Sequence, residues 1–229
     1  IISGVTEVVN QYGRIIVMED DLVVSPYFLS FMNFSLDYFC NDERIISINA
    51  YAYPIKGLPN YFFLKGADCW GWATWKRGWD LFNPDGNYLL AQINKQNMRR
   101  RFDYDNSYPY FKSLKSQTMG RTDSWAIRWY ASALTYGKLS LYTGKSYVRN
   151  IGMDSTGVHS DKTTLFDSDI NMEAPIYDQI RDLTVEEDDR AYLMHVKYLQ
   201  SIKISLLFAK LKHRINQNLR YVWNICNHS

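Results

Sequence analysis

The chain has 229 residues, of which 46% are hydrophobic and 22% are charged, a composition typical of a globular protein with a sizeable core. Its formal net charge of +2 is too small to indicate nucleic-acid binding, and its apolar runs fall far short of the roughly 18 residues that a membrane span needs. The 16% aromatic content is high, and aromatic rings serve both large cores and flat, partly apolar ligands such as sugars.

The cysteines are isolated from one another. Cys40, Cys69 and Cys226 form no CxxC pair. This spacing is typical of reduced thiols in a cytosolic protein, and it argues against a disulfide framework or a zinc site.

The chain begins at Ile1, without Met, and enters a helical pattern over residues 3–12 that Gly13 is suited to end. An α/β domain would normally have strands before this point. We therefore expect the sequence to be an N-terminally truncated piece.

A buried strand followed at once by acids comes next. Ile15, Ile16 and Val17 are β-branched, which favours a strand, and Glu19, Asp20 and Asp21 follow. Three adjacent carboxylates repel one another unless a cation or hydrogen bonds compensate them, and oxygen-only clusters suit Mg²⁺ or Mn²⁺. The alternative is a solvated acidic loop. We expect this strand to lie inside a sheet, with its upstream partners absent from the chain.

A βαβ unit is predicted around this strand. Ser25 and Pro26 are a helix N-cap and N1 pair, apolar residues at helical spacing continue to about Phe39, and residues 45–50 are a second buried strand. Strand, helix and strand in this order predict that the two strands pair in parallel.

Four tryptophans lie within residues 70–79. The spacing of Trp72, Trp75 and Trp79 places them on one helical face, which favours a core role. Trp70 lies between loop glycines ahead of that helix, where its indole is suited to shape a pocket and to stack on a sugar ring.

The middle of the chain reads as short strands at 61–64, 139–142 and 146–150, with helices at 87–102, from Tyr108 to about Gln117, and from Thr122 or Asp123 to about Tyr136. The triple arginine at 99–101 either complements the helix dipole or meets an anionic ligand. Asp123 either caps its helix or acts as a general base in a cleft.

The loop at 151–160 is rich in glycine and hydroxyl side chains, so its amides are suited to phosphate, and His159 either contacts a metal or diphosphate or is a surface histidine. Residues 191–229 contain no Asp or Glu but several Lys and Arg among apolar residues at roughly helical spacing. We expect such a helix either to lie on an anionic membrane surface or to dock on the missing N-terminal part of the protein or on another subunit. We expect a catalytic part at 1–165 and a helical, basic C-terminal extension at 166–229.

Together these features resemble a known family. Residues 17–26, Val-Met-Glu-Asp-Asp-Leu-Val-Val-Ser-Pro, resemble the acidic metal-binding motif of GT-A nucleotide-sugar glycosyltransferases, in particular N-acetylglucosaminyltransferase I-like enzymes and bacterial family 2-like sugar transferases. The segments 66–79, 122–125 and 157–160 follow in the expected order. The resemblance implies an α/β fold of the GT-A, Rossmann-related type, a mixed sheet flanked by helices.

The resemblance also implies a metal-dependent transfer that inverts the anomeric centre of a hexosyl or N-acetylhexosaminyl group. It assigns Mn²⁺ or Mg²⁺ to Asp21 and His159, with His159 in the loop over the diphosphate, and it assigns the base to Asp123. It also assigns contacts with the donor to Glu19, Asp20, Trp70 and Gly71, and a contact with the acceptor to Trp72.

The partners implied are a nucleotide-sugar donor and a carbohydrate acceptor, in surface polysaccharide synthesis at the cytoplasmic side of a membrane that the basic C-terminal helix contacts. One alternative is a non-catalytic carbohydrate-binding or scaffold module of the same fold. Another is a metal-dependent phosphate-ester hydrolase, which ranks last because a second metal would need more His or Asp ligands than the motifs offer.

Overall fold

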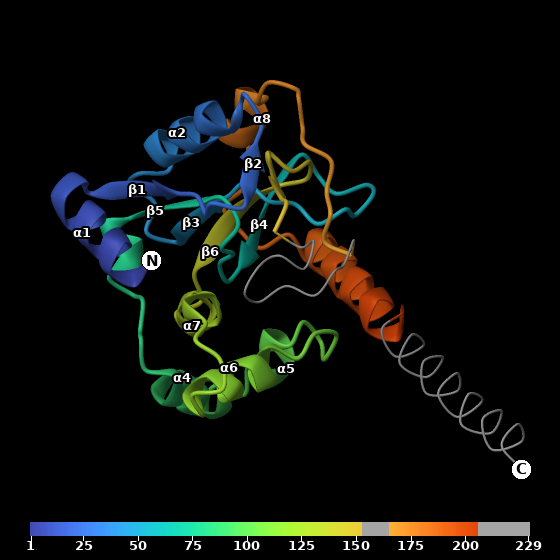
Figure 1. Cartoon of the computed structure of the whole chain (residues 1–229). Coiled ribbons are helices and arrows are strands. Elements are labelled where there is room, and N and C mark those ends of the chain that lie inside the picture. The colour runs from blue at the N-terminus through green and yellow to red at the C-terminus, as the bar shows by residue number, and fades with distance from the viewer. Residues whose placement is uncertain (153–164, 206–229) are drawn as a thin grey trace, which may run out of the picture.

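The computed structural model describes residues 1–152 and 165–205. Within them, a five-stranded mixed sheet is flanked by helices, so the predicted α/β class is confirmed (Figure 1). Its strand order is β1 (Arg14–Val17), β5 (Trp72–Trp75), β3 (Ile45–Asn49), β6 (Leu139–Thr143) and β4 (Tyr61–Lys65). A separate two-stranded sheet pairs β2 (Leu22–Val24) with β7 (Val148–Asn150).

The predicted parallel pairing of the first two strands is wrong. β5 lies between β1 and β3 and runs antiparallel to both, whereas β3 pairs in parallel with β6. β1 is therefore an edge strand of the described sheet and not an interior one.

The tryptophan-rich segment explains the error. Residues 72–75 form a strand, and the helix α3 (Lys76–Trp79) begins only after it. Because side chains alternate across a strand, Trp72 and Trp75 lie on opposite faces of the sheet, in different apolar clusters. A spacing of three residues thus mimicked a helical face.

The helix before β1 ends where the sequence predicts, whereas the predicted N-cap at Ser25 is wrong, since the N-cap of the next helix is Tyr27. α1 (Ile2–Tyr12) ends at Gly13, whose left-handed conformation (φ 78°) lets its N–H reach the carbonyl of Val9. α2 (Phe28–Tyr38) starts two residues after Pro26, because Ser25 forms a turn whose hydroxyl accepts from the Tyr27 N–H and donates to the Asn171 carbonyl.

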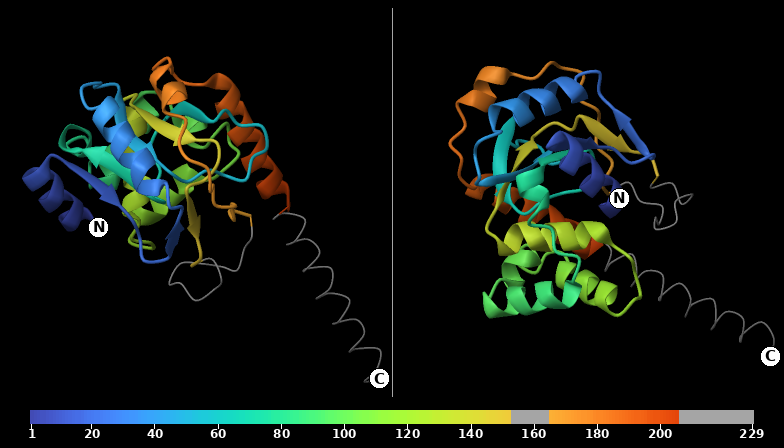
Figure 2. Two further views of the ribbon diagram at one scale, coloured as in Figure 1. Left: turned by 90° about the horizontal axis from the view of Figure 1, so that it is seen from above. Right: turned by 90° about the vertical axis from the view of Figure 1, so that its left-hand side faces the viewer.

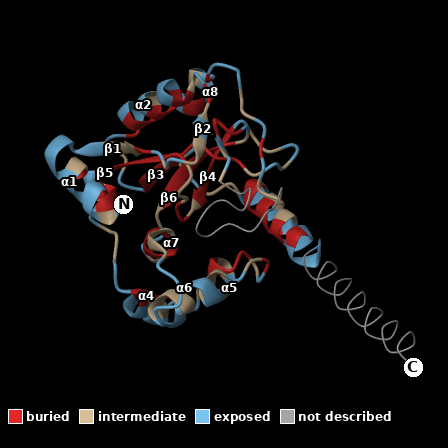
Figure 3. Cartoon of the chain, in the orientation of Figure 1, coloured by how far each residue is buried: buried red, intermediate tan, exposed pale blue. Residues whose placement is uncertain are grey.

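Helices cover both faces of the sheet (Figure 2). α2 and α8 (Tyr177–Arg181) lie on one face, and α7 (Trp125–Thr135) lies on the other, with α4 (Gly86–Lys95), α5 (Arg99–Phe102) and α6 (Tyr110–Thr118) beyond it. The helix expected over 87–102 is interrupted at Asn97, whose φ of 55° ends α4 before α5. Buried residues line the sheet and the inward helix faces (Figure 3).

Residues 166–205 pack into the same cores as the rest of the chain. Ile180 joins the cluster between the sheet and α2, while Tyr192, Leu199 and Ile202, on a helix that spans residues 189–205, join the cluster with α4 and α7. Glu187 forms ion pairs with Lys65 and Arg101. The expected boundary at 165/166 is thus not a packing boundary in the described residues.

No helix in the described ranges combines the length and apolar character needed to cross a membrane. The residues on which the membrane-surface expectation mainly rests, 206–229, lie outside the described part of the chain, as does Cys226.

Candidate functional site

The acidic loop leads from β1 into β2, and the pairing of β2 with β7 fixes the position of Asp21. Leu22 pairs with Asn150, so the Ile151 N–H donates to the Asp21 carbonyl at 2.8 Å. The Asn150 side-chain amide donates to Oδ2 of Asp21 at 3.1 Å. Oδ1 of Asp21 is buried and has no hydrogen-bond partner among the described residues.

Gly152 faces the same carboxylate. A Cβ at this position would lie 2.4 Å from Oδ2 of Asp21 and 2.9 Å from its Cβ. The absence of a side chain at Gly152 is therefore what allows the chain to pass against Asp21.

Glu19 is the partly buried acid of the loop, whereas Asp20 is exposed. Burial, and after it the neighbouring charges of Asp21 and Asp20, raise the pKa of the Glu19 carboxyl, while a side-chain hydrogen bond with Trp125 opposes the rise. This bond brings the acidic loop to the first residue of α7. The acidic loop and the start of α7 are thus in contact.

The residues of this loop fit a divalent cation that takes few ligands from the protein. The described residues contain no group of three or more His, Cys, Asp or Glu that could hold an ion alone. Oδ1 of Asp21 is nonetheless a buried acceptor without a donor, and the repulsion acting on Glu19 is what a cation relieves. Mg²⁺ commonly uses one or two carboxylates and completes its shell with water and phosphate oxygens.

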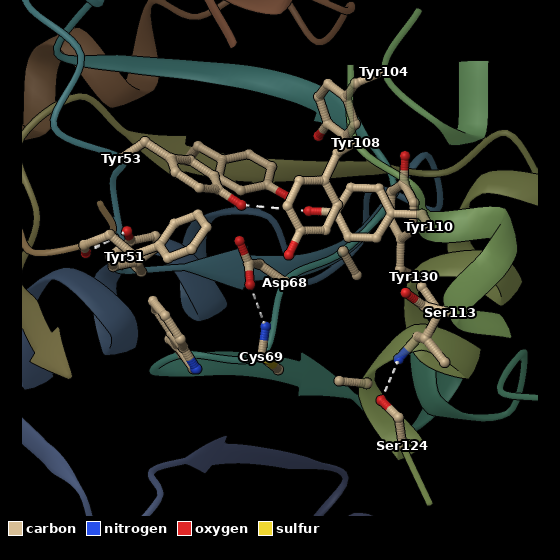
Figure 4. Close-up of a pocket in the computed structure, with 16 residues that line it drawn as sticks. Tyr51, Tyr53, Asp68, Cys69, Tyr104, Tyr108, Tyr110, Ser113, Ser124 and Tyr130 are labelled. Atoms are coloured by element: carbon tan, nitrogen blue, oxygen red, sulfur yellow. Dashed lines mark hydrogen bonds between the residues drawn. The ribbon is translucent and has the colours of Figure 1, made fainter. Parts of the chain in front are cut away.

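A second feature of the structure is an aromatic pocket (Figure 4). Its volume is about 300 Å³, and it is enclosed by segments that follow β3 and β4, by the turn after α5, and by the start of α7. Seven tyrosines contribute to its wall together with Trp70 and Phe166; they are Tyr51, Tyr53, Tyr104, Tyr108, Tyr110, Tyr130 and Tyr142.

Asp68 is the carboxylate of this pocket, and the sequence analysis did not single it out. Its Oδ1 accepts from the Cys69 N–H at 2.7 Å, and Figure 4 shows the carboxylate directed toward the tyrosine rings. Burial raises the pKa of the Asp68 carboxyl. A single acid within the segment 66–71 carries no sequence signal of its own, because only the fold brings the tyrosines around it.

Cys69 follows Asp68 and also lines the pocket. Burial raises the pKa of its thiol, and the charges of Asp68, Glu19 and Asp21 raise it further. The thiol is therefore exposed to the negative charge of carboxylates from both the pocket and the acidic loop. The thiol is free, as is that of Cys40.

Asp123 lies just outside the pocket. Ser124 is the N-cap of α7 and accepts from the Ile127 N–H, so the expected capping role of Thr122 or Asp123 is wrong. The Asp123 side chain is 92% exposed and accepts from Nη2 of Arg128 at 3.1 Å. Ser124 lines the pocket, which leaves Asp123 one residue from its rim.

The three residues expected to contact sugars separate in the structure. Trp70 lines the pocket, with its ring edge-to-face against Tyr51 at 4.7 Å. Gly71 is buried at φ 63°, and a Cβ there would lie 2.6 Å from Val148 Cγ1. Trp72 is fully buried and packs against Trp125 at 5.4 Å, so it belongs to the core and offers no face to a sugar.

Two further expectations have different outcomes. His159 and most of its loop lie outside the described residues. The arginines at 99–101 are engaged within the chain: Arg100 pairs with Asp105, Arg101 pairs with Glu187, and the Arg99 guanidinium lies 4.6 Å from the centre of the Phe111 ring.

No family model matches this chain, and no curated protein matches it in sequence.

Proposed function

We propose that this chain carries the catalytic face of a GT-A-type glycosyltransferase, which moves a sugar from a nucleotide-sugar donor to a carbohydrate hydroxyl and inverts the anomeric centre. The observation that carries the proposal is the proximity of the acidic loop to the aromatic pocket. Glu19 bonds to Trp125, whose neighbours Ser124 and Ala126 line the pocket, and the charges of Glu19 and Asp21 act on Cys69 in the pocket wall. A donor of this kind needs a cation-dependent diphosphate site next to a site for a sugar ring. The acidic loop has the chemistry of the first site, and the aromatic pocket has that of the second.

Asp21 is the residue proposed to hold Mn²⁺ or Mg²⁺, through Oδ1, which has no donor in the described part of the chain. Such an ion, when bound, neutralises the negative charge that the leaving diphosphate develops. Glu19, held by Trp125, and the exposed Asp20 supply further negative charge on the donor side.

Asp123 is the proposed base. It takes the proton from the acceptor hydroxyl, whose oxygen forms the bond to the anomeric carbon as the bond from that carbon to the diphosphate oxygen breaks. A single displacement of this type needs no protein nucleophile. The ion pair with Arg128, which is itself buried, orients the Asp123 carboxylate at the start of α7.

The test measures release of nucleoside diphosphate from UDP-, GDP- and TDP-sugars with Mn²⁺. We expect Asp21→Ala to lose Mn²⁺-dependent donor binding, and Asp123→Asn to lose transfer while keeping that binding. Asp80→Asn is the matched control, because Asp80 is exposed and pairs with Lys76. Unchanged transfer in Asp123→Asn would remove the base assignment, and unchanged donor affinity in Asp21→Ala would remove the metal assignment.

A non-catalytic carbohydrate-binding module is the second candidate, and the tyrosine-rich pocket is the observation that favours it. It predicts sugar binding without nucleoside diphosphate release from any donor. For the enzyme, we propose an acceptor from surface polysaccharide synthesis at the cytoplasmic face of a membrane, as the resemblance and the unpaired cysteines suggest.

A further inference from the structure

The aromatic pocket contains one charged side chain among the described residues that line it, and this is Asp68. Arg101 acts on Tyr104 and Tyr130, but its guanidinium is bound to Glu187 and lies 3.4 Å from the centre of the Tyr192 ring. No lining cation therefore compensates Asp68. Glu19 and Asp21, which act on Cys69 in the pocket wall, make the local potential more negative still.

The tyrosines of the pocket remain neutral. Burial raises the pKa of each phenol, and Asp68 adds to the rise for Tyr51, Tyr53, Tyr104, Tyr110 and Tyr142. Their hydroxyls are accordingly uncharged hydrogen-bonding groups; those of Tyr53 and Tyr110, for example, lie 3.5 Å apart.

Asp68 has hydrogen-bonding capacity to spare. The donors that reach it within the described chain are the backbone N–H groups of the next two residues, Cys69 and Trp70, and the Cys69 thiol. An ionised carboxylate accepts about four hydrogen bonds. The remaining capacity faces the ring-lined space (Figure 4).

The ligand that matches these groups is a single sugar ring. Its apolar faces pack on aromatic rings, and its hydroxyls donate to a carboxylate. A pocket of about 300 Å³ is at the small end of ligand sites, which suits one ring and not a chain of them. An anionic ligand would instead meet an uncompensated like charge at short range.

We propose that this pocket binds one uncharged sugar ring and that Asp68 is its specificity-determining residue. Asp68 accepts hydrogen bonds from the ring hydroxyls and repels sugars that carry a carboxylate, phosphate or sulfate. The proposal deepens the proposed function and rests on it for the identification of the ligand as a sugar.

The experiment is calorimetric titration of the full chain with methyl glycosides of glucose, galactose, mannose and N-acetylglucosamine, and with glucuronate and galacturonate. We expect at least one neutral glycoside to bind, and the uronates to bind at least tenfold more weakly. Asp68→Asn should weaken the binding of the neutral glycoside at least tenfold and should reduce the discrimination against uronates. Asp80→Asn should bind both as the wild type does. Failure of all four glycosides to bind, equal binding of uronates, or unchanged affinity in Asp68→Asn would overturn the proposal.

A measurement on the wild-type protein tests the proposal even if the Asp68→Asn variant does not fold. Because Cys69 lines the pocket, a saturating glycoside should slow its alkylation by iodoacetamide severalfold, whereas the exposed Cys40 should react at an unchanged rate. Equal alkylation of Cys69 with and without the glycoside that binds would place that ligand elsewhere and overturn the proposal.

Binding of nucleoside diphosphate in the presence of Mn²⁺ separates this inference from the proposed function. We expect Asp68→Asn to retain it. Mn²⁺-dependent binding without glycoside binding would overturn the specificity role alone, and glycoside binding without either Mn²⁺-dependent binding or nucleoside diphosphate release would overturn the transferase proposal alone.

Discussion

The side-chain amide of Asn150 donates a hydrogen bond of 3.1 Å to Oδ2 of Asp21 and leaves Oδ1 without a partner among the described residues. Asn150 is the last residue of β7, and Asp21 precedes β2, so the pairing of these two short strands sets the direction of the carboxylate. The candidate metal ligand is thus positioned by a two-stranded sheet and not by the main one.

Gly152→Ala should disturb this arrangement, because the new Cβ would lie 2.4 Å from Oδ2 of Asp21. We expect a loss of about 1–3 kcal/mol in the free energy of unfolding, the usual cost of overpacking, together with weaker Mn²⁺-dependent binding. Urea unfolding measures the first and calorimetry the second. Gly4→Ala, in α1 with nothing near its Cβ, is the control and should be neutral or stabilising. Equal stability of the two variants would contradict this account of Gly152.

Glu19→Gln should stabilise the protein at neutral pH. Burial, Asp21 and Asp20 raise the folded-state pKa of Glu19 above its ordinary value of 4.5. The folded state therefore holds this proton more tightly than the unfolded state does, and stability from this group is lost as pH rises from 4.5 through the raised pKa. Gln carries no such charge, so the difference in unfolding free energy between variant and wild type should grow in favour of the variant over that window. A difference independent of pH, in urea unfolding from pH 4 to pH 8, would refute the expectation.

His195 should destabilise the fold in acid. Burial lowers its pKa from 6.5 to about 4, and the ring packs 5.5 Å from Tyr53 and 5.7 Å from Phe62. The unfolded state takes up the proton first, so stability falls as pH drops from 6.5 toward 4, by about 3 kcal/mol from this group at its full extent. His195→Gln should be less stable at pH 7 but should show a shallower decline over the same range. A decline as steep as that of wild type would assign the acid sensitivity to other groups.

Trp72→Ala and Trp70→Ala should differ sharply. Trp72 is fully buried among Trp79, Trp125 and Trp129, so its truncation should cost about 3–5 kcal/mol. Trp70 lies at the pocket wall with partial exposure, and its truncation should cost less but should weaken glycoside binding. Thermal unfolding and calorimetry measure the two effects. A sugar-binding defect in a folded Trp72 variant that retains Trp70 would restore the acceptor role first expected for Trp72.

Where local chemistry alone acts, the sequence was sufficient. Gly13 ends α1 because it accepts a left-handed backbone, and the apolar runs at 15–17, 45–49 and 139–143 form strands because β-branched and aromatic residues fit a buried pleat. The acidic loop at the end of β1 was located in the same way. Its metal role, like the transferase activity, stays a prediction.

Tertiary structure alone decided how these pieces meet. The spacing of the tryptophans predicted a helix over residues 72–79. Residues 72–75 instead form a strand, because they pair with both β1 and β3. Asp68 gained its importance because residues far apart in the chain, Tyr53 and Tyr110 among them, enclose it. Tyr192 and Leu199, which follow the division expected at residue 165, pack in the core beside α7. Propensity and capping depend on residues that are neighbours in sequence. Strand order, pocket walls and burial depend on which segments, far apart in the chain, pack together and exclude water.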